Sequence, residues 1–220
     1  MSERIILIIE IIGTVAFAIS GAEVGLKKGM DIFGVAILGL TTAVGGGVIR
    51  DLVLGNTPPA TFRDPIYAVI AICASVVMFL PAVRRFFDRR EKLYHYSMLL
   101  MDSLGLGIFT VVGIQTAYSM NQEHGVFLLI FVGVVTGVGG GILRDVMAGN
   151  TPYVFVKHFY ATASLLGALL TVVCWPWCGE MWSMLAGAAL VLALRLLAAH
   201  FRWSLPKACL KAGAESMRED

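Results

Sequence analysis

The stretch GGGVIRDLVLGNTPP, from Gly45 to Pro59, places a glycine triplet, an Arg-Asp pair and a Gly-Asn-Thr-Pro run between two apolar segments. A near copy, GGGILRDVMAGNTPY, runs from Gly139 to Tyr153. The flanking segments also match loosely, since AFAISGA resembles GIFTVVGI and IYAVIA resembles FYATAS. The chain therefore contains an internal repeat, and we expect the repeated stretch to decide its fold.

The composition is typical of a membrane protein. Of 220 residues, 58% are hydrophobic and 15% are charged, whereas about a quarter of a soluble domain is charged. A helix needs roughly 20 apolar residues to cross the hydrocarbon core of a bilayer. The sequence predicts an all-α multi-pass membrane protein with seven transmembrane helices, near residues 5–26, 31–54, 65–83, 94–118, 125–148, 155–176 and 181–201.

Basic residues in the connections predict the orientation of the chain. The third connection, residues 84–92, is rich in Arg and Lys, whereas the fourth (SMNQEHG) and the sixth (CGE) contain neither. We therefore expect a protein of the cell (inner) membrane with its N-terminus outside and its C-terminus in the cytoplasm. Three tryptophans fall at the expected outer boundary, where an aromatic belt would lie, namely Trp175, Trp177 and Trp182.

Each copy of the repeat holds three predicted spans, which is an odd number. The second copy must then cross the membrane in the opposite sense, which is the inverted-repeat plan of many transport proteins. We predict a first three-helix repeat over residues 1–92 and a second, inverted repeat over residues 93–178. A seventh helix over residues 179–201 and a cytoplasmic tail over residues 202–220 complete the chain.

The glycine triplets have two interpretations. Each glycine costs a helix about 1 kcal/mol relative to alanine, so a triplet would kink or unwind the helix and free carbonyl oxygens to bind a cation in a buried or wet site. Small residues also let helices pack closely. Duplication of the triplets with their flanks favours the kink, although both uses can hold together. The pore or kink candidates are Gly45, Gly46, Gly47, Gly139, Gly140 and Gly141.

Charged residues within spans are candidates for gating or charge pairing, because a charge inside a membrane normally faces a cavity or a partner. Neighbouring residues on a helix point in different directions and pair poorly with each other. Because the two copies are related by pseudo-symmetry, the arginine of one copy could instead pair with the aspartate of the other. The alternative is that Arg50 and Arg144 lie near helix ends and extend their side chains to water. The cross-pairs would join Arg50 to Asp145 and Arg144 to Asp51. Further intramembrane polar candidates are Asp102, Ser20 and Thr110, while Glu23 and Asp31, near span ends, are expected to be solvated.

Three motifs together resemble the prokaryotic branch of the trimeric intracellular cation (TRIC) channels, whose domain is also labelled glycine transporter (UPF0126-type). They are DSLGLGIFTVVG, the duplicated GGG(V/I)(I/L)RD and the duplicated GNTP. The resemblance implies a homotrimer with one pore in each protomer and potassium as the main permeant ion. It also implies a pore flanked by the second and fifth helices, kinked at the triplets. The Lys-Glu-Val motif of animal members is missing from this sequence.

Two functions remain open. In a potassium-permeable monovalent cation channel, carbonyl oxygens and aspartates replace the hydration of the ion, and the arginines stand near the gate. In a secondary transporter of a small amino acid such as glycine, an arginine and helix N-termini would bind the carboxylate of the substrate. The expected partners are the lipid bilayer, monovalent cations and two further copies of the chain.

An enzyme is not expected, because no Ser-His, Cys-His or metal-ligand cluster is visible in the sequence. No cofactor is expected beyond permeant K⁺ or Na⁺. The net charge of +2, without a basic arm, argues against nucleic-acid binding. Cys174 and Cys178 lie at the expected outer edge of the membrane. They could form a disulfide or remain free thiols.

Overall fold

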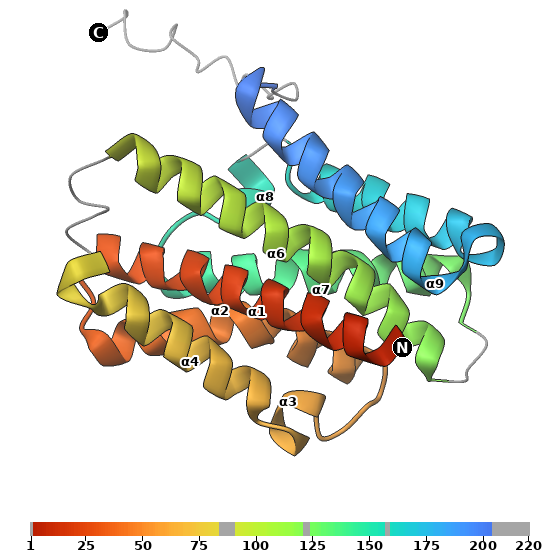
Figure 1. Cartoon of the computed structure of the whole chain (residues 1–220), viewed down its shortest axis with the longest axis horizontal. Coiled ribbons are helices and arrows are strands. Elements are labelled where there is room, and N and C mark those ends of the chain that lie inside the picture. The colour runs from red at the N-terminus through yellow and green to blue at the C-terminus, as the bar shows by residue number, and fades with distance from the viewer. Residues whose placement is uncertain (1, 84–90, 121–123, 157–158, 204–220) are drawn as a thin grey trace, which may run out of the picture.

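The computed structural model describes residues 2–83, 91–120, 124–156 and 159–203. Lys157 and most of the basic third connection and of the C-terminal tail lie outside these residues. Every regular element in the described part is a helix (Figure 1). The helices are α1 (Ser2–Lys27), α2 (Ile32–Val53), α3 (Ala60–Arg63), α4 (Ile66–Phe79), α6 (Glu91–Ser119), α7 (Val126–Met147), α8 (Tyr153–Val156) and α9 (Ala161–His200).

Five helices of the described residues are long and apolar enough to cross a membrane, namely α1, α2, α6, α7 and α9. The predicted all-helical, multi-pass membrane fold is therefore confirmed. The third predicted span, over residues 65–83, is too long, because α4 has 14 residues and ends at Phe79. Leu80 precedes Pro81 and takes extended backbone angles, as the clash with a proline ring requires.

The helix α9 is a hairpin that contains the last two predicted spans. Gly179 has φ 73° and ψ 172°, angles that favour glycine, and separates a first arm (161–178) from a second arm (180–200). Figure 1 shows the second arm doubling back along the first. A Cβ atom on Gly167 would lie 3.0 Å from the carbonyl oxygen of Gly187, so small residues let the two arms touch.

The repeated Gly-Asn-Thr-Pro run ends both α2 and α7 in the same way. Gly55 and Gly149 have φ of 73° and 66°, a left-handed conformation that glycine adopts without steric cost. After α2, the N–H of Asn56 donates to the carbonyl of Asp51 at 2.8 Å, and after α7 the N–H of Asn150 donates to Asp145 at 2.8 Å. This backbone pattern is the Schellman motif, so the run ends each helix.

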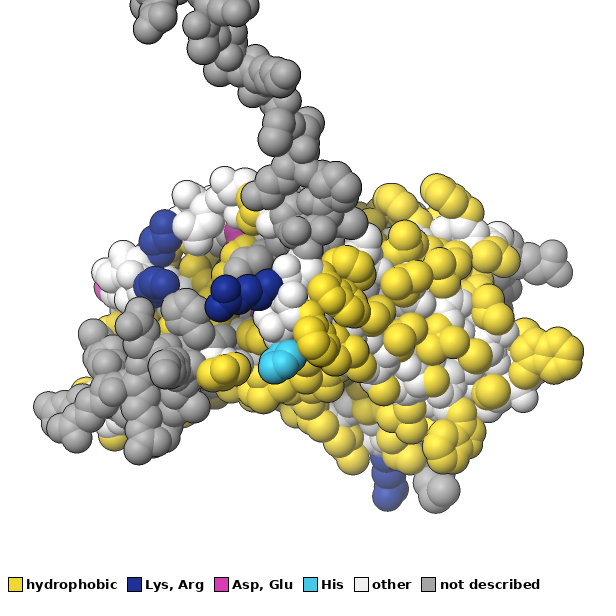
Figure 2. All heavy atoms as spheres, turned by 90° about the horizontal axis from the view of Figure 1, so that it is seen from above, with side chains coloured by type: hydrophobic (Ala, Val, Ile, Leu, Met, Phe, Trp, Pro, Cys, Tyr) yellow, Lys and Arg dark blue, Asp and Glu magenta, His cyan; other side chains and the backbone are white. Residues whose placement is uncertain are grey.

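The helices form two groups that meet in the middle of the molecule. In the first group, α1 packs on α2 and α4, and in the second group, α6 packs on α7 and α9. The groups join through contacts of α2 with α7 and of α1 with α6. Figure 1 shows that α1 and α6 run in opposite directions. Hydrophobic side chains cover much of the face in Figure 2, and most of its lysines and arginines gather toward one end.

The glycine triplets hold α2 and α7 together, in agreement with the close-packing interpretation, and neither helix unwinds at its triplet. Both helices run without a break through Gly45–Gly47 and Gly139–Gly141. A Cβ atom on Gly46 would overlap the carbonyl oxygen of Thr136, and a Cβ atom on Gly140 would overlap that of Thr42. The two backbones are in direct contact, and this packing outweighs the low helix propensity of glycine.

We expect Gly46→Ala to destabilise the protein and Gly47→Ala to leave its stability equal or higher. The first methyl group would overlap the α7 backbone, and overpacking typically costs about 1–3 kcal/mol. A Cβ atom on Gly47 meets only the Arg50 guanidinium, at 3.8 Å, and alanine gains helix propensity. The measurement is the midpoint of thermal unfolding in detergent, and equal midpoints for the two variants would contradict the direct contact.

Candidate functional site

A fully buried arginine stands at the junction of three long helices. The Arg144 side chain in α7 is 0% exposed. Its Nη1 donates hydrogen bonds to Ser20 Oγ of α1 and to Asp102 Oδ1 of α6, each at 2.6 Å, and its Nε donates to Asp145 Oδ1 at 2.9 Å. A buried charge is tolerated only when it is paired and hydrogen-bonded. The charge on Arg144 therefore fixes the relative positions of α1, α6 and α7.

A second arginine and a tyrosine complete this site. Tyr160, just before α9, donates from its hydroxyl to Asp102 Oδ1 at 3.3 Å. Arg195, from the second arm of α9, places Nη2 3.6 Å from Asp102 Oδ2, and its guanidinium lies 4.8 Å from the centre of the Tyr160 ring. We call this site the buried cluster, and its members are Ser20, Asp102, Arg144, Asp145, Tyr160 and Arg195.

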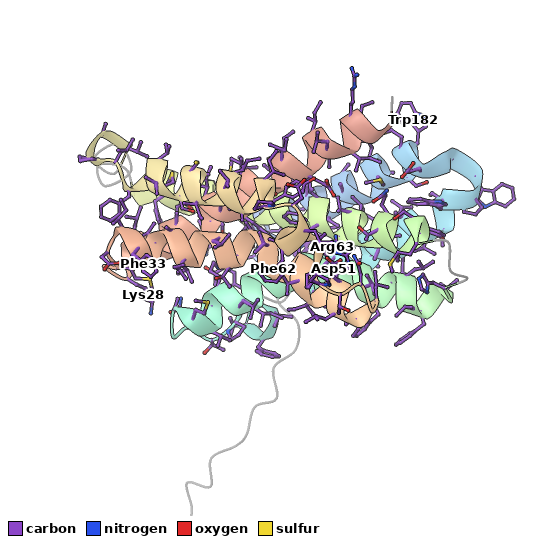
Figure 3. The ribbon with its side chains drawn as sticks, turned by 90° about the horizontal axis from the view of Figure 1, so that it is seen from below. Lys28, Phe33, Asp51, Phe62, Arg63 and Trp182 are labelled. Carbon is purple, nitrogen blue, oxygen red and sulfur yellow. The ribbon has the colours of Figure 1, made fainter. Side chains whose placement is uncertain are left out.

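The two repeated arginines pair with the aspartates that follow them, so the predicted cross-pairs are wrong. Arg50 Nε donates to Asp51 Oδ1 at 2.8 Å, as Arg144 does to Asp145. The reason lies in the segment after each helix, which holds the aspartate in place. Asp51 Oδ2 accepts the backbone N–H of Ala60, at the start of α3, at 2.7 Å. In the view of Figure 3, Asp51 lies near Phe62 and Arg63 of the same short helix.

The second copy uses the same device, because Asp145 Oδ2 accepts the backbone N–H of Tyr153, at the start of α8, at 2.9 Å. Snorkelling to water does not describe Arg144, whose side chain is fully buried, and Arg50 is only 9% exposed. Each Arg-Asp pair is therefore buried, and its aspartate connects a long helix to the short helix that follows it.

The first copy carries a similar but smaller set of groups. Tyr67 of α4 donates from its hydroxyl to Glu10 of α1, as Tyr160 donates to Asp102 in the second copy. We call Glu10, Arg50, Asp51 and Tyr67 the first-copy group.

Other predicted polar residues lie apart from the buried cluster. Thr110 donates to the carbonyl of Leu106 at 2.7 Å and shares a 2.7 Å hydrogen bond with Ser164 of α9, which gives it a packing role. Asp31 is exposed and caps α2, as expected near a span end. The prediction that Glu23 is solvated is wrong, because it is 1% exposed and accepts a hydrogen bond from Ser97 of α6.

Sequence reasoning missed Tyr160, Arg195 and Glu23 as members or neighbours of the site. Arg195 had a usable signal, since it is the lone charge in the apolar run VLALRLLAAH, and such a charge needs a partner. Tyr160 had a weaker signal, its alignment with Tyr67. Cys174 and Cys178 are both free thiols.

We expect Arg144→Gln to lower stability far more than Arg50→Gln. Removing one partner of a buried ion pair typically costs about 3–5 kcal/mol, and Arg144 leaves two buried carboxylates, whereas Arg50 is slightly exposed and pairs with one. Thermal unfolding in detergent measures the difference. Asp102→Asn should cost less in the Arg144→Gln background than in the parent chain, and additive effects would contradict the coupling.

Comparison with known families agrees with this architecture. The sequence model of the family described as glycine transporter matches residues 7–82 and 99–176. The chain is 35% identical to the UPF0126 inner membrane protein YadS of Escherichia coli (strain K12), over 90% of this chain and 92% of that protein. It is 38% identical to a UPF0126 membrane protein of Deinococcus radiodurans, over 85% and 84% of the two chains.

Solved structures extend the likeness to three dimensions. One, from work on conductance through TRIC cation channels, has a TM-score of 0.81 and 37% identity over 93% of this chain and 98% of that one. A prokaryotic TRIC channel crystallised in 0.5 M KCl has a TM-score of 0.82 and 30% identity, over 92% and 100% of the two chains. The TRIC orthologue of Rhodobacter sphaeroides has a TM-score of 0.81 and 32% identity, over 90% of this chain and 99% of that one. This chain is a member of the TRIC family of multi-pass membrane proteins, which is also described as the glycine transporter or UPF0126 family.

Proposed function

We propose that this protein is a monovalent cation channel of the inner membrane, with potassium as its main permeant ion. The observation that carries the proposal is the buried cluster, a set of two arginines and two aspartates enclosed by apolar helices. Charges in such a place are costly and mark ion or substrate pathways. The solved relatives with the same fold are cation channels by name.

The pathway of this proposal follows the faces of α2 and α7 that carry Arg50 and Arg144. The glycine triplets contribute close packing at the crossing of these helices rather than free carbonyl oxygens. The buried cluster is 0–5% exposed at every charged group, and a guanidinium repels a passing cation. The conformation described here is accordingly the closed one, with Arg144 and its carboxylates across the path.

We further propose seven spans, with α1–α4 and the segment from α6 to the first arm of α9 as inverted repeats. Matching contacts support this assignment. A Cβ atom on Gly21 would meet the Thr42 hydroxyl and the Gly39 backbone, and a Cβ atom on Gly113 would meet the equivalent Thr136 and Gly133. The opposite directions of α1 and α6 in Figure 1 also support it. The second arm of α9 has no counterpart among the described residues of the first copy.

Transport of a small amino acid such as glycine is the second candidate function. It is favoured by the unpaired N–H donors of Arg144 Nη2 and Arg195 Nε within the described residues, since a guanidinium binds a carboxylate well. The description of the matching family as glycine transporter also supports it. For the assembly, we propose the homotrimer that the name of the TRIC family implies, with one pathway in each protomer.

The topology of the proposal can be tested with single cysteines in a chain whose native cysteines are replaced by serine. Lys28→Cys and Gly125→Cys, both at exposed positions, should react with an impermeant thiol reagent from opposite faces of the membrane. Lys28 and Trp182 lie at opposite ends of the molecule in Figure 3, so Trp182→Cys should react from the same face as Gly125→Cys. Labelling of Lys28→Cys and Gly125→Cys from one face would exclude the inverted arrangement.

Reconstitution of the purified protein into planar bilayers tests the function. We expect unitary currents whose reversal potential in a KCl gradient follows K⁺ rather than Cl⁻. In parallel, liposomes should show no saturable uptake of labelled glycine above protein-free liposomes. Glycine uptake without unitary currents would instead establish the carrier. Cross-linking in mild detergent should stop at the trimer, and a series that ends at the dimer would contradict the proposed assembly.

A further inference from the structure

The buried cluster contains one group that the internal repeat does not explain. Arg195 lies on the second arm of α9, outside the duplicated segments, yet its side chain is only 6% exposed and faces Asp102. The first-copy group has one arginine for two carboxylates, Glu10 and Asp51. The buried cluster has two arginines for its two aspartates, Asp102 and Asp145, with the buried Glu23 as a neighbour. The second arm therefore adds a cation that the first-copy group lacks.

Arg195 is held more weakly than Arg144. The 3.6 Å contact from Arg195 Nη2 to Asp102 Oδ2 is too long for a hydrogen bond, and Arg195 Nε has no partner among the described residues. Its remaining contact is the face of the Tyr160 ring, a cation–π interaction worth roughly 0.5–2 kcal/mol. Arg144, by contrast, has three hydrogen bonds of 2.6–2.9 Å.

The second arm also has a means of moving. It joins the first arm through Gly179, whose left-handed φ of 73° has nothing within 4 Å of where a Cβ atom would stand. Where the arm crosses α6, the contact is between small residues, because a Cβ atom on Gly107 would lie 3.0 Å from the Ala188 carbonyl. The three hydrogen bonds of Arg144 go to Ser20, Asp102 and Asp145, none of which lies on this arm. A rotation about the Gly179 turn that overcomes the packing on α6 would therefore separate Arg195 from Asp102 and leave these bonds in place.

We propose that Arg195 is a positioning residue that neutralises Asp102 and keeps the path closed, and that withdrawal of the second arm of α9 frees Asp102 Oδ2 to meet a monovalent cation. This inference rests on the proposed channel function. Asp102 keeps Arg144 and Tyr160 as partners after the withdrawal, so the cluster stays folded while its net charge becomes negative. The cation selectivity of the open state then comes from the freed carboxylate oxygen.

The first experiment compares Arg195→Gln, Arg195→Lys and Arg202→Gln in planar bilayers. Arg195→Gln should raise open probability about tenfold, as expected for the loss of roughly 1.4 kcal/mol of ion-pair and cation–π attraction. Arg195→Lys should stay near the parent value. Arg202→Gln, which removes the same charge from an exposed position, should also behave like the parent. Adding Asp102→Asn to Arg195→Gln should lower the K⁺ over Cl⁻ preference, which a purely structural role of Arg195 would leave unchanged.

The second experiment does not depend on currents. Ser103→Cys, at a position 0% exposed beside Asp102, should react with a small thiol reagent several times faster when Arg195→Gln is present. Ser75→Cys, equally buried in the first group of helices, should show no such change. An unchanged rate at residue 103 together with an unchanged open probability would overturn the proposal. Absence of currents in the parent chain, with accelerated labelling at residue 103, would reject the channel function and leave the movement of the arm standing.

A third experiment tests the proposed movement of the second arm in a chain that retains Arg195, by means of an engineered disulfide. Between Gly107 and Val191 the Cβ separation would be 3.4 Å, close to the value of about 3.8 Å in disulfides. In a chain without its native cysteines, Gly107→Cys with Val191→Cys should form a disulfide that ties the second arm to α6. Oxidation should abolish the currents, and a reductant should restore them. Currents that persist under oxidation, with the disulfide verified by mass spectrometry, would show that the arm does not gate the path.

Discussion

The structure depends on the neutralisation of one buried charge. An arginine without access to water must find carboxylates and hydrogen-bond acceptors, and Arg144 finds them on three elements, with Ser20 on α1, Asp102 on α6 and Asp145 on its own helix. Because the ion pairs are enclosed by apolar side chains, removal of one partner leaves another charge uncompensated. The relative placement of the two groups of helices is therefore coupled to this cluster.

The glycine crossing of α2 and α7 supplies the geometry that the cluster needs. Backbone contact at Gly46 and Gly140 brings the helices closer than any larger residue would allow. Each arginine lies four residues beyond the central glycine of its triplet, which places it on the same face of the helix, one turn further along. The short helices α3 and α8 then return toward the ends of α2 and α7, where backbone N–H groups bind Asp51 and Asp145.

The proposed plan of two repeats and one added helix accounts for the difference between the two copies. The first-copy group and the buried cluster share a tyrosine–carboxylate contact and an Arg-Asp pair. Only the buried cluster receives a further cation, from the second arm of α9. The proposed role of Arg195 in keeping the path closed depends on this difference between the two copies.

The sequence by itself determined the elements that follow from local rules. The apolar runs predicted the long helices, and the Gly-Asn-Thr-Pro runs lie at their ends at Gly55 and Gly149. The repeated Arg-Asp pair marked Arg144 as a candidate, and Asp102 and Ser20 were marked separately as polar residues inside apolar spans. Tertiary structure alone decided what these groups contact. The triplets pack instead of unwinding, because the neighbouring helix offers a backbone surface that outweighs helix propensity. Each arginine pairs with the adjacent aspartate, because the segment after each helix fixes that carboxylate. Arg195 and Tyr160 join the cluster through a hairpin turn at Gly179, and a contact between residues so distant in sequence depends on the path of the whole chain, which no local pattern specifies.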